Sequence, residues 1–156
     1  MVNRIKNKTS VIDIDFITAV PSHKSNKVTR DYDTANVLAR YIARRVKLPL
    51  KKVLYQPYMV PKQHEADTFE ERYQNVKDKY HIKKGAKLKG KTVLLIDDIK
   101  TTGATLSECA RQLKLGGANM VIAASAVTMP SKKRKEKINN WNFYLKAVQY
   151  KYRYLK

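Results

Sequence analysis

Two adjacent carboxylates, Asp97 and Asp98, follow an apolar run and precede a loop of small and hydroxyl-bearing residues. The stretch reads VLLIDDIKTTGATL, and its loop consists of Thr101, Thr102, Gly103, Ala104 and Thr105. Small residues let backbone N–H groups converge on an anion, threonine hydroxyls add donors, and a helix that begins at the loop favours negative charge. Carboxylates accept hydrogen bonds from vicinal sugar hydroxyls, or bind indirectly through the water shell of Mg²⁺. Together they predict a ribose 5-phosphate site.

Other interpretations fit this stretch less well than a sugar-phosphate site. The residues do not form the G-x-x-x-x-G-K-[ST] run of a Walker loop or the G-x-G-x-x-G of dinucleotide folds. A purely structural role stays open, in which the aspartates cap a helix and Gly103 relieves a tight turn. Two acids after four apolar residues are costly at a sheet edge unless they bind something, which favours the binding site.

The segments that must position this stretch alternate between strand and helix. Apolar patterns predict strands over residues 10–21, 91–97 and 120–128, and a short extended piece over 51–60. Helical spacing and capping residues predict helices over 31–46, 67–82 and from residue 104 to the glycines at 116 and 117. This order predicts an α/β fold with a mostly parallel sheet flanked by helices.

Length and charge set the wider expectations. The 156 residues are enough for a single domain over residues 1–156, with its core over about 11–130. No membrane-spanning run or signal peptide is present, so a cytoplasmic protein without a membrane partner is expected. The net charge of +20 favours a polyanionic partner, although a lysine-rich proteome would raise the same count. The single cysteine, Cys109, is predicted to be a buried structural thiol.

The C-terminal segment, residues 131–156, is basic and aromatic. It holds nine Lys or Arg residues, one acid and six aromatic residues. Cations that follow a phosphate backbone, interleaved with rings on which bases stack, predict a surface for single-stranded DNA or RNA. The alternative is an edge strand with its tyrosines packed on the domain. The candidate nucleic-acid contacts are Lys132, Lys133, Arg134, Trp141, Tyr152 and Arg153.

The DDIKTTGAT stretch resembles the motif with which type I phosphoribosyltransferases bind 5-phosphoribosyl 1-pyrophosphate (PRPP). Within that superfamily the chain is most similar to the ComF-type, competence-associated branch, over about residues 11–130. The matching segments are a first strand ending in Val20-Pro21, the basic loop SHKSNKVT after it, and EERYQNV before the central strand. Asn26 stands where a basic residue is usual, DYDT replaces G-F-N-Q, and the zinc ribbon that often precedes the domain in that branch is not expected here.

The resemblance implies a type I phosphoribosyltransferase fold with a basic aromatic C-terminal extension, and an activity. Asp97 and Asp98 would be the catalytic pair that binds the ribose hydroxyls of PRPP, and residues 101 to 105 would bind its 5-phosphate. A nucleophile, usually a base nitrogen, would displace pyrophosphate at the anomeric carbon. Mg²⁺ would enter bound to PRPP oxygens, and no directly bound metal is implied.

Two further segments would complete the site by the same resemblance. Ser22, His23 and Lys24 would form the loop that faces the pyrophosphate, and Arg72 and Asn75 would belong to a mobile segment over the site.

Three classes of function are therefore left open. The first is an active phosphoribosyltransferase with an unidentified base or nucleotide acceptor. The second is a protein of the same fold that binds single-stranded DNA or RNA without turnover, in DNA uptake, processing or a defence ribonucleoprotein. The third is a subunit of a larger assembly. A homodimer is compatible with each of the three.

Overall fold

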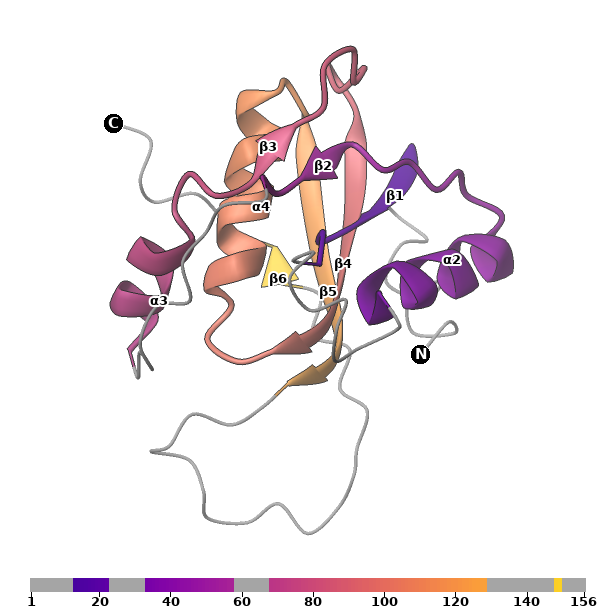
Figure 1. Cartoon of the computed structure of the whole chain (residues 1–156). Helices are drawn as coiled ribbons and strands as arrows, with labels where there is room; N and C mark the ends of the chain where they lie inside the picture. The colour runs from indigo at the N-terminus through magenta and orange to yellow at the C-terminus, as the bar shows by residue number, and fades with distance from the viewer. Residues whose placement is uncertain (1–12, 23–32, 58–67, 129–147, 150–156) are drawn as a thin grey trace, which may run out of the picture.

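The central sheet has four strands in the order β1-β4-β5-β6 (Figure 1). The computed structural model describes residues 13–22, 33–57, 68–128 and 148–149. Strands β1 (Phe16–Ala19), β4 (Thr92–Lys100) and β5 (Met120–Thr128) run parallel, and β6 (Val148–Gln149) is antiparallel to β5. The sheet is mostly parallel, as the alternation of strands and helices predicts.

Helices cover both faces of this sheet. In β4, Val93 and Leu95 belong to the apolar cluster that contains Leu113 of α4 (Ala104–Leu115). The alternate residues of the strand, Leu94 and Ile96, belong to a second apolar cluster that contains Ile42 of α2 (Thr34–Val46). Because side chains alternate along a strand, the continuous apolar run of β4 serves two cores at once. Cys109 lies fully buried in the α4 cluster as a free thiol, in agreement with the prediction.

Side chains cap helices α2 and α3, at starts that the sequence predicts. The Asn36 backbone N–H donates to the carboxylate of Asp33, which begins α2, over 3.1 Å. Thr68 begins α3 (Phe69–Val76) and forms a reciprocal capping box with Glu71. These bonds satisfy N–H groups that a helix start otherwise leaves unpaired.

Helix α3 is shorter than predicted. The backbone is already extended at Lys77, and Asp78 takes a left-handed φ of 57°, so the helical pattern stops before residue 82. The chain then forms β3 (His81–Ile82), which pairs antiparallel with β2 (Leu54–Tyr55) in a separate two-stranded sheet. The predicted extended piece is therefore a short strand outside the main sheet (Figure 1).

Strand β4 is longer than predicted. The apolar pattern ends at the two acids, but the strand continues to Lys100 because β5 still offers partners there, such as Ser125 opposite Asp97 and Val127 opposite Ile99. The acids therefore lie within the carboxyl-terminal part of the central strand, in its backbone ladder. Their positions are set by the ladder and not by loop conformation.

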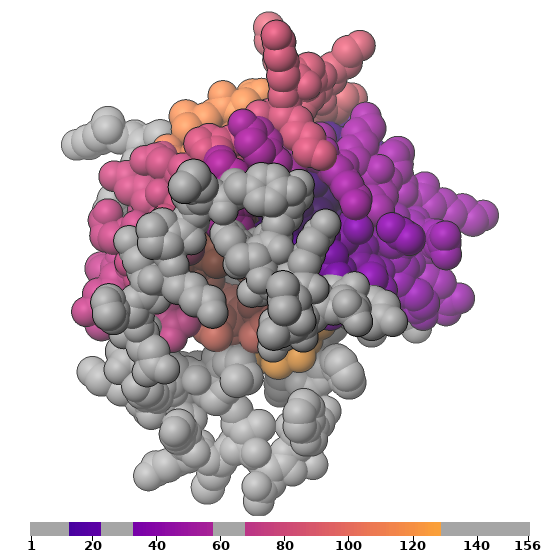
Figure 2. All heavy atoms as spheres, viewed as in Figure 1, coloured from indigo at the N-terminus to yellow at the C-terminus, as the bar shows by residue number. Residues whose placement is uncertain are grey.

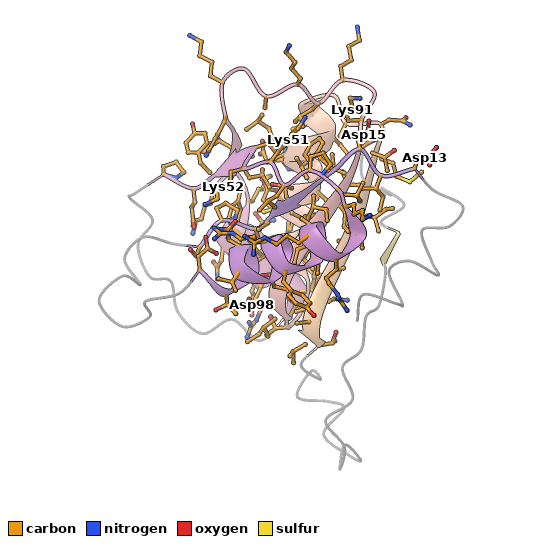
Figure 3. All side chains as sticks on the ribbon, turned by 90° about the vertical axis from the view of Figure 1, so that its right-hand side faces the viewer. Asp13, Asp15, Lys51, Lys52, Lys91 and Asp98 are labelled. Atoms are coloured by element: carbon orange, nitrogen blue, oxygen red, sulfur yellow. The ribbon has the colours of Figure 1, made fainter. Side chains whose placement is uncertain are left out.

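An ion pair fixes the opposite end of the sheet. The Lys91 ammonium donates to the Asp15 carboxylate over 2.7 Å, and the Thr92 N–H donates to its second oxygen over 2.8 Å. The Lys91 hydrogen bond is the main reason that the pKa of Asp15 is lowered. In Figure 3, Asp15 and Lys91 lie at the end of β1 and β4 that is remote from Asp98. The contact joins the starts of two neighbouring strands, and so helps to set the register of their far ends.

The structure describes part of the chain on which the membrane and nucleic-acid predictions depend. Among the described helices, none combines the length and the apolar composition needed to cross a bilayer. Of the basic aromatic segment, only Val148–Gln149 is described, as the edge strand β6. The six candidate nucleic-acid contacts of that segment lie outside the described residues.

Candidate functional site

The two adjacent acids lie side by side near the carboxyl end of β4. Asp97 follows Val93 and Leu95 in the alternation toward α4, and its carboxyl is hydrogen-bonded to the Asp98 side chain. Asp97 is 8% exposed, whereas Asp98 is half-buried. The pair therefore presents one carboxylate from the interior and one at the surface.

Burial changes the chemistry of Asp97. It raises the pKa of this carboxyl to about 7, and the negative charge of Asp98 adds to the effect. One interaction opposes the rise, because the Asp98 backbone N–H donates to the Asp97 carboxylate over 2.9 Å. The Ile99 N–H donates in the same way to Asp98, over 2.8 Å. Buried acids with raised pKa values cluster at functional sites, because binding and catalysis use groups whose charge is poised to change.

The loop after β4 leads into α4 through a glycine. Gly103 begins the helix with a left-handed φ of 90° and makes no side-chain cap. The start of α4 therefore differs from the starts of α2 and α3, where Asp33 and Thr68 occupy the capping position. Within the loop, the Thr102 hydroxyl accepts from the Ala104 N–H over a long 3.4 Å. The open helix start, with threonines around it, is a suitable place for an anion.

Two side chains from elsewhere in the chain contact this loop. Arg72 of α3 donates from Nη1 to the Thr101 hydroxyl over 3.3 Å, across 29 residues of sequence. The Tyr80 hydroxyl is hydrogen-bonded to Thr105, and burial of Tyr80 raises its pKa. The structure thus brings the arginine of EERYQNV and the loop of DDIKTTGAT together. It adds a tyrosine for which the sequence offers no signal.

For the remaining candidate residues, the structure gives a position on the fold or none at all. Ser22 is exposed, three residues after the carboxyl end of β1, and Asn75 is half-buried on α3. His23 and Lys24 lie outside the described residues. In the space-filling view, α3 lies to the left and α2 to the right of the salmon and orange atoms that come from the middle of the chain (Figure 2).

Asp97 and Asp98 are the carboxylates that this site offers to a Mg²⁺ ion. Among the described residues, no group of three or more His, Cys, Asp or Glu side chains could hold a metal ion. A pair of carboxylates offers the hard oxygen atoms that Mg²⁺ prefers, but Mg²⁺ keeps waters and uses phosphate oxygens where protein ligands are few. Asp98, the more exposed acid, could contact such an ion directly or through water.

Solved structures with the same fold include two adenine phosphoribosyltransferases. One is 16% identical, with a TM-score of 0.55 over 81% of this chain and 64% of the other. That from Saccharomyces cerevisiae is 14% identical, with a TM-score of 0.54 over 81% of this chain and 63% of the other. This chain therefore spans slightly less than two thirds of each enzyme. Identities this low show a common fold and nothing about a common substrate.

A third solved structure is the glutamine PRPP amidotransferase from B. subtilis, in complex with ADP and GMP. It is 20% identical, with a TM-score of 0.53 over 80% of this chain and 25% of that enzyme. A search of curated protein sequences finds no match.

A sequence family also matches this chain. The phosphoribosyl transferase domain model matches residues 33–154, more than three quarters of the chain. The match includes both acids, the loop with its glycine, and the arginine that contacts the loop. The chain belongs to the phosphoribosyl transferase domain family and has the type I phosphoribosyltransferase fold.

Proposed function

We propose that this protein binds PRPP and transfers its phosphoribosyl group to an unidentified base or nucleotide, with release of pyrophosphate. One observation carries the proposal: the two acids lie near the end of β4, and a short loop joins that strand to a helix start that a glycine leaves without a side-chain cap. Acceptors for ribose hydroxyls and donors for a phosphate are thus adjacent on one continuous backbone. Membership of the family supports the same substrate.

Each group has a role in this reaction. Asp98 and Asp97 would accept from the ribose hydroxyls, and residues 101 to 105 would bind the 5-phosphate. As the bond from the anomeric carbon to pyrophosphate breaks, positive charge develops on the ribose ring, and carboxylates nearby stabilise it. The acceptor nitrogen then forms the new bond and releases its proton. Mg²⁺ would enter with the pyrophosphate oxygens and neutralise the charge of the leaving group.

Calorimetric titration of PRPP with Mg²⁺ tests the proposal. The wild type, first freed of nucleic acid in high salt, is expected to bind PRPP, and Asp97→Asn/Asp98→Asn is expected to bind at least about a hundredfold more weakly, because two charge-assisted hydrogen-bond acceptors are lost. A wild type that does not bind PRPP would remove the proposed function.

The finer placement within the family rests on three short segments. We propose the ComF-type branch, supported by Val20-Pro21, the basic loop after it and EERYQNV. In that branch Ser22, His23 and Lys24 would face the pyrophosphate, and Asn75 would lie on the segment over the site. Exposed Ser22 and half-buried Asn75 are compatible with contact to a ligand.

A second function, binding of single-stranded nucleic acid, is favoured by the surface of α2. Residues 34–57 contain six Lys or Arg residues and no acid. We define the basic α2 surface by its exposed members Arg40, Tyr41, Arg44, Arg45 and Lys47. Tyr41 is 56% exposed among these cations, which have no ion-pair partner within the described residues. Lys51 and Lys52 lie above α2 in Figure 3 and extend the positive charge.

Charge reversal on α2 tests this second function. Arg40→Glu/Arg44→Glu is expected to weaken binding of a single-stranded oligonucleotide about tenfold or more near 0.1 M salt, and to lower the slope of log affinity against log salt by about one to two. Lys84→Glu/Lys87→Glu, two exposed lysines between β3 and β4, makes the same change in net charge and serves as the control. Equal losses in both variants would show attraction by overall charge without a defined surface.

A further inference from the structure

Glu108 is a buried charge that the proposed reaction does not use. It lies in the second turn of α4 and is 0% exposed. A carboxylate taken out of water destabilises a fold by several kcal/mol unless donors surround it. An acid at such a position therefore needs an explanation from its contacts.

Five donors surround this carboxylate. Oε1 accepts from the Asp78 backbone N–H at 3.0 Å, from Arg111 Nη2 at 2.8 Å and from Gln112 Nε2 at 2.9 Å. Oε2 accepts from Arg111 Nε at 2.8 Å and from the Tyr73 hydroxyl at 3.4 Å. Arg111 also pairs with the Asp78 side chain, and its hydrogen bonds to Glu108 are the main cause of its raised pKa. Both oxygens are fully used.

These contacts join α3 to α4. Tyr73 belongs to α3, Asp78 belongs to the turn after it, and Glu108 and Arg111 belong to α4. No residue of α3 is buried, and its apolar contribution to the core is the partly buried Val76. A helix with so little buried apolar surface is not held by packing alone. The polar contacts around Glu108 therefore determine much of the position of α3.

Helix α3 also carries the arginine at the phosphate loop. Arg72 is the residue next to Tyr73, and its Nη1 lies 3.3 Å from the Thr101 hydroxyl. Glu108 in turn lies four residues after Ala104, where α4 begins at the same loop. One buried carboxylate thus connects the helix that starts at the loop with the helix whose arginine reaches over it.

We propose that Glu108 is a positioning residue for the phosphate subsite. It fixes α3 on α4 and so holds the Arg72 guanidinium at residues 101 to 105, where it adds charge-assisted donors for the 5-phosphate of the ligand. The inference rests on the proposed function, because it assigns Arg72 to the 5-phosphate end of PRPP. Coupling is reciprocal, so a bound 5-phosphate also stabilises the contact between α3 and α4.

A double-mutant cycle with ribose 5-phosphate as the probe tests this coupling. Glu108→Gln keeps the shape of the side chain but replaces one acceptor with a donor that faces other donors. Glu108→Gln and Arg72→Ala are each expected to weaken binding about tenfold, and the double variant to bind no more weakly than either, because both changes remove the same contact. Independent losses that multiply to about a hundredfold, or full affinity in Glu108→Gln, would overturn the inference.

Two more variants make the test specific. Asp78→Asn is the matched control: it makes the same carboxylate-to-amide change beside Arg111, at a side chain that is 65% exposed, and leaves the bonds to Glu108 in place. Its affinity is expected to stay within about twofold of the wild type. If Glu108→Gln does not fold, Tyr73→Phe removes only the hydroxyl donor, and an affinity loss of about twofold to fivefold is expected.

Hydrogen exchange of the ligand-free protein separates this inference from the proposed function. Glu108→Gln is expected to speed amide exchange in residues 68–80 and 100–103 about tenfold, and to leave β5 unchanged. Unchanged exchange in either segment would overturn the inference even if ribose 5-phosphate binds. A wild type that does not bind ribose 5-phosphate would count against the proposed function, and the exchange rates of the two segments would then decide the positioning role.

Discussion

The Asp97→Asn variant is expected to be more stable than the wild type when no ligand is present, by about 2 kcal/mol at pH 8. The reason is the buried carboxylate itself. Burial and the neighbouring Asp98 raise its pKa to about 7, against 3.8 for the free side chain, so ionisation destabilises the folded state. The full difference corresponds to about 4 kcal/mol, and we expect about half because an amide oxygen is a weaker acceptor than a carboxylate for the Asp98 backbone N–H. An amide also replaces the repulsion between two carboxylates with a donor that Asp98 can accept from.

The sign of this effect depends on pH. Between about pH 4 and pH 7 the folded wild type retains a proton on Asp97 that the unfolded chain has released, so its free energy of unfolding falls as the pH rises. The variant lacks this group, and its advantage should grow across that window and level off above it. Denaturant unfolding followed by circular dichroism at pH 4, 6 and 8 measures the difference.

A matched control and a contrary result complete this test. Asp13→Asn changes an exposed acid at the other end of the sheet (Figure 3) and is expected to shift the free energy of unfolding by less than about 0.5 kcal/mol. If Asp97→Asn destabilises the protein at pH 8, the carboxylate has a structural role, and its burial is no argument for a ligand.

The same variant should lose affinity for PRPP, because an amide is the weaker acceptor for ribose hydroxyls. A residue whose replacement stabilises the fold and weakens binding is retained for function, since selection for stability alone would remove it. Measuring stability and PRPP affinity in the same variant is therefore more informative than measuring either alone. If the variant lost affinity because its fold was damaged, its free energy of unfolding would fall as well.

Local patterns predicted the elements that hold the site. The apolar run before Asp97 predicted the central strand, and a capping residue at Asp67 or Thr68 predicted the start of α3, which begins after Thr68. Both are short-range signals, because strand periodicity and helix capping depend on neighbours in the sequence. The resemblance to type I phosphoribosyltransferases was carried by the DDIKTTGAT stretch, and the match to the phosphoribosyl transferase domain model confirms the resemblance at that level.

Contacts between distant segments could not be predicted in this way. Nothing near Tyr80 indicates its bond to Thr105, and β3 depends on pairing with Leu54 and Tyr55, far from it in sequence. The sequence offers one weak signal for Glu108, which is an acid followed three residues later by an arginine. Tertiary contacts decide such positions, and a single sequence does not display them.

Replacing Gly103 by alanine is expected to weaken binding of ribose 5-phosphate on the order of tenfold to a hundredfold. Gly103 adopts a φ of 90° where the loop enters α4, a conformation that L side chains rarely take. A β-carbon there either strains the backbone or moves the loop, and a small displacement of the donors from a phosphate is enough to reduce affinity strongly. Calorimetry with ribose 5-phosphate measures the loss, and unfolding is expected to show a decrease of about 1 kcal/mol in stability.

Gly90→Ala separates the loss of the loop geometry from the cost of a strained backbone. Gly90 has a similar φ of 73°, and a β-carbon added there meets no atom within 4 Å. It precedes β4 at the end of the strand remote from the acids, so the variant should lose a similar amount of stability and keep its full affinity for ribose 5-phosphate. If both variants lose stability but neither loses affinity, the loop around Gly103 is a structural turn, and the phosphate must bind elsewhere. If only Gly103→Ala loses affinity, the backbone at the start of α4 is itself part of the binding site, as the two acids beside it would require.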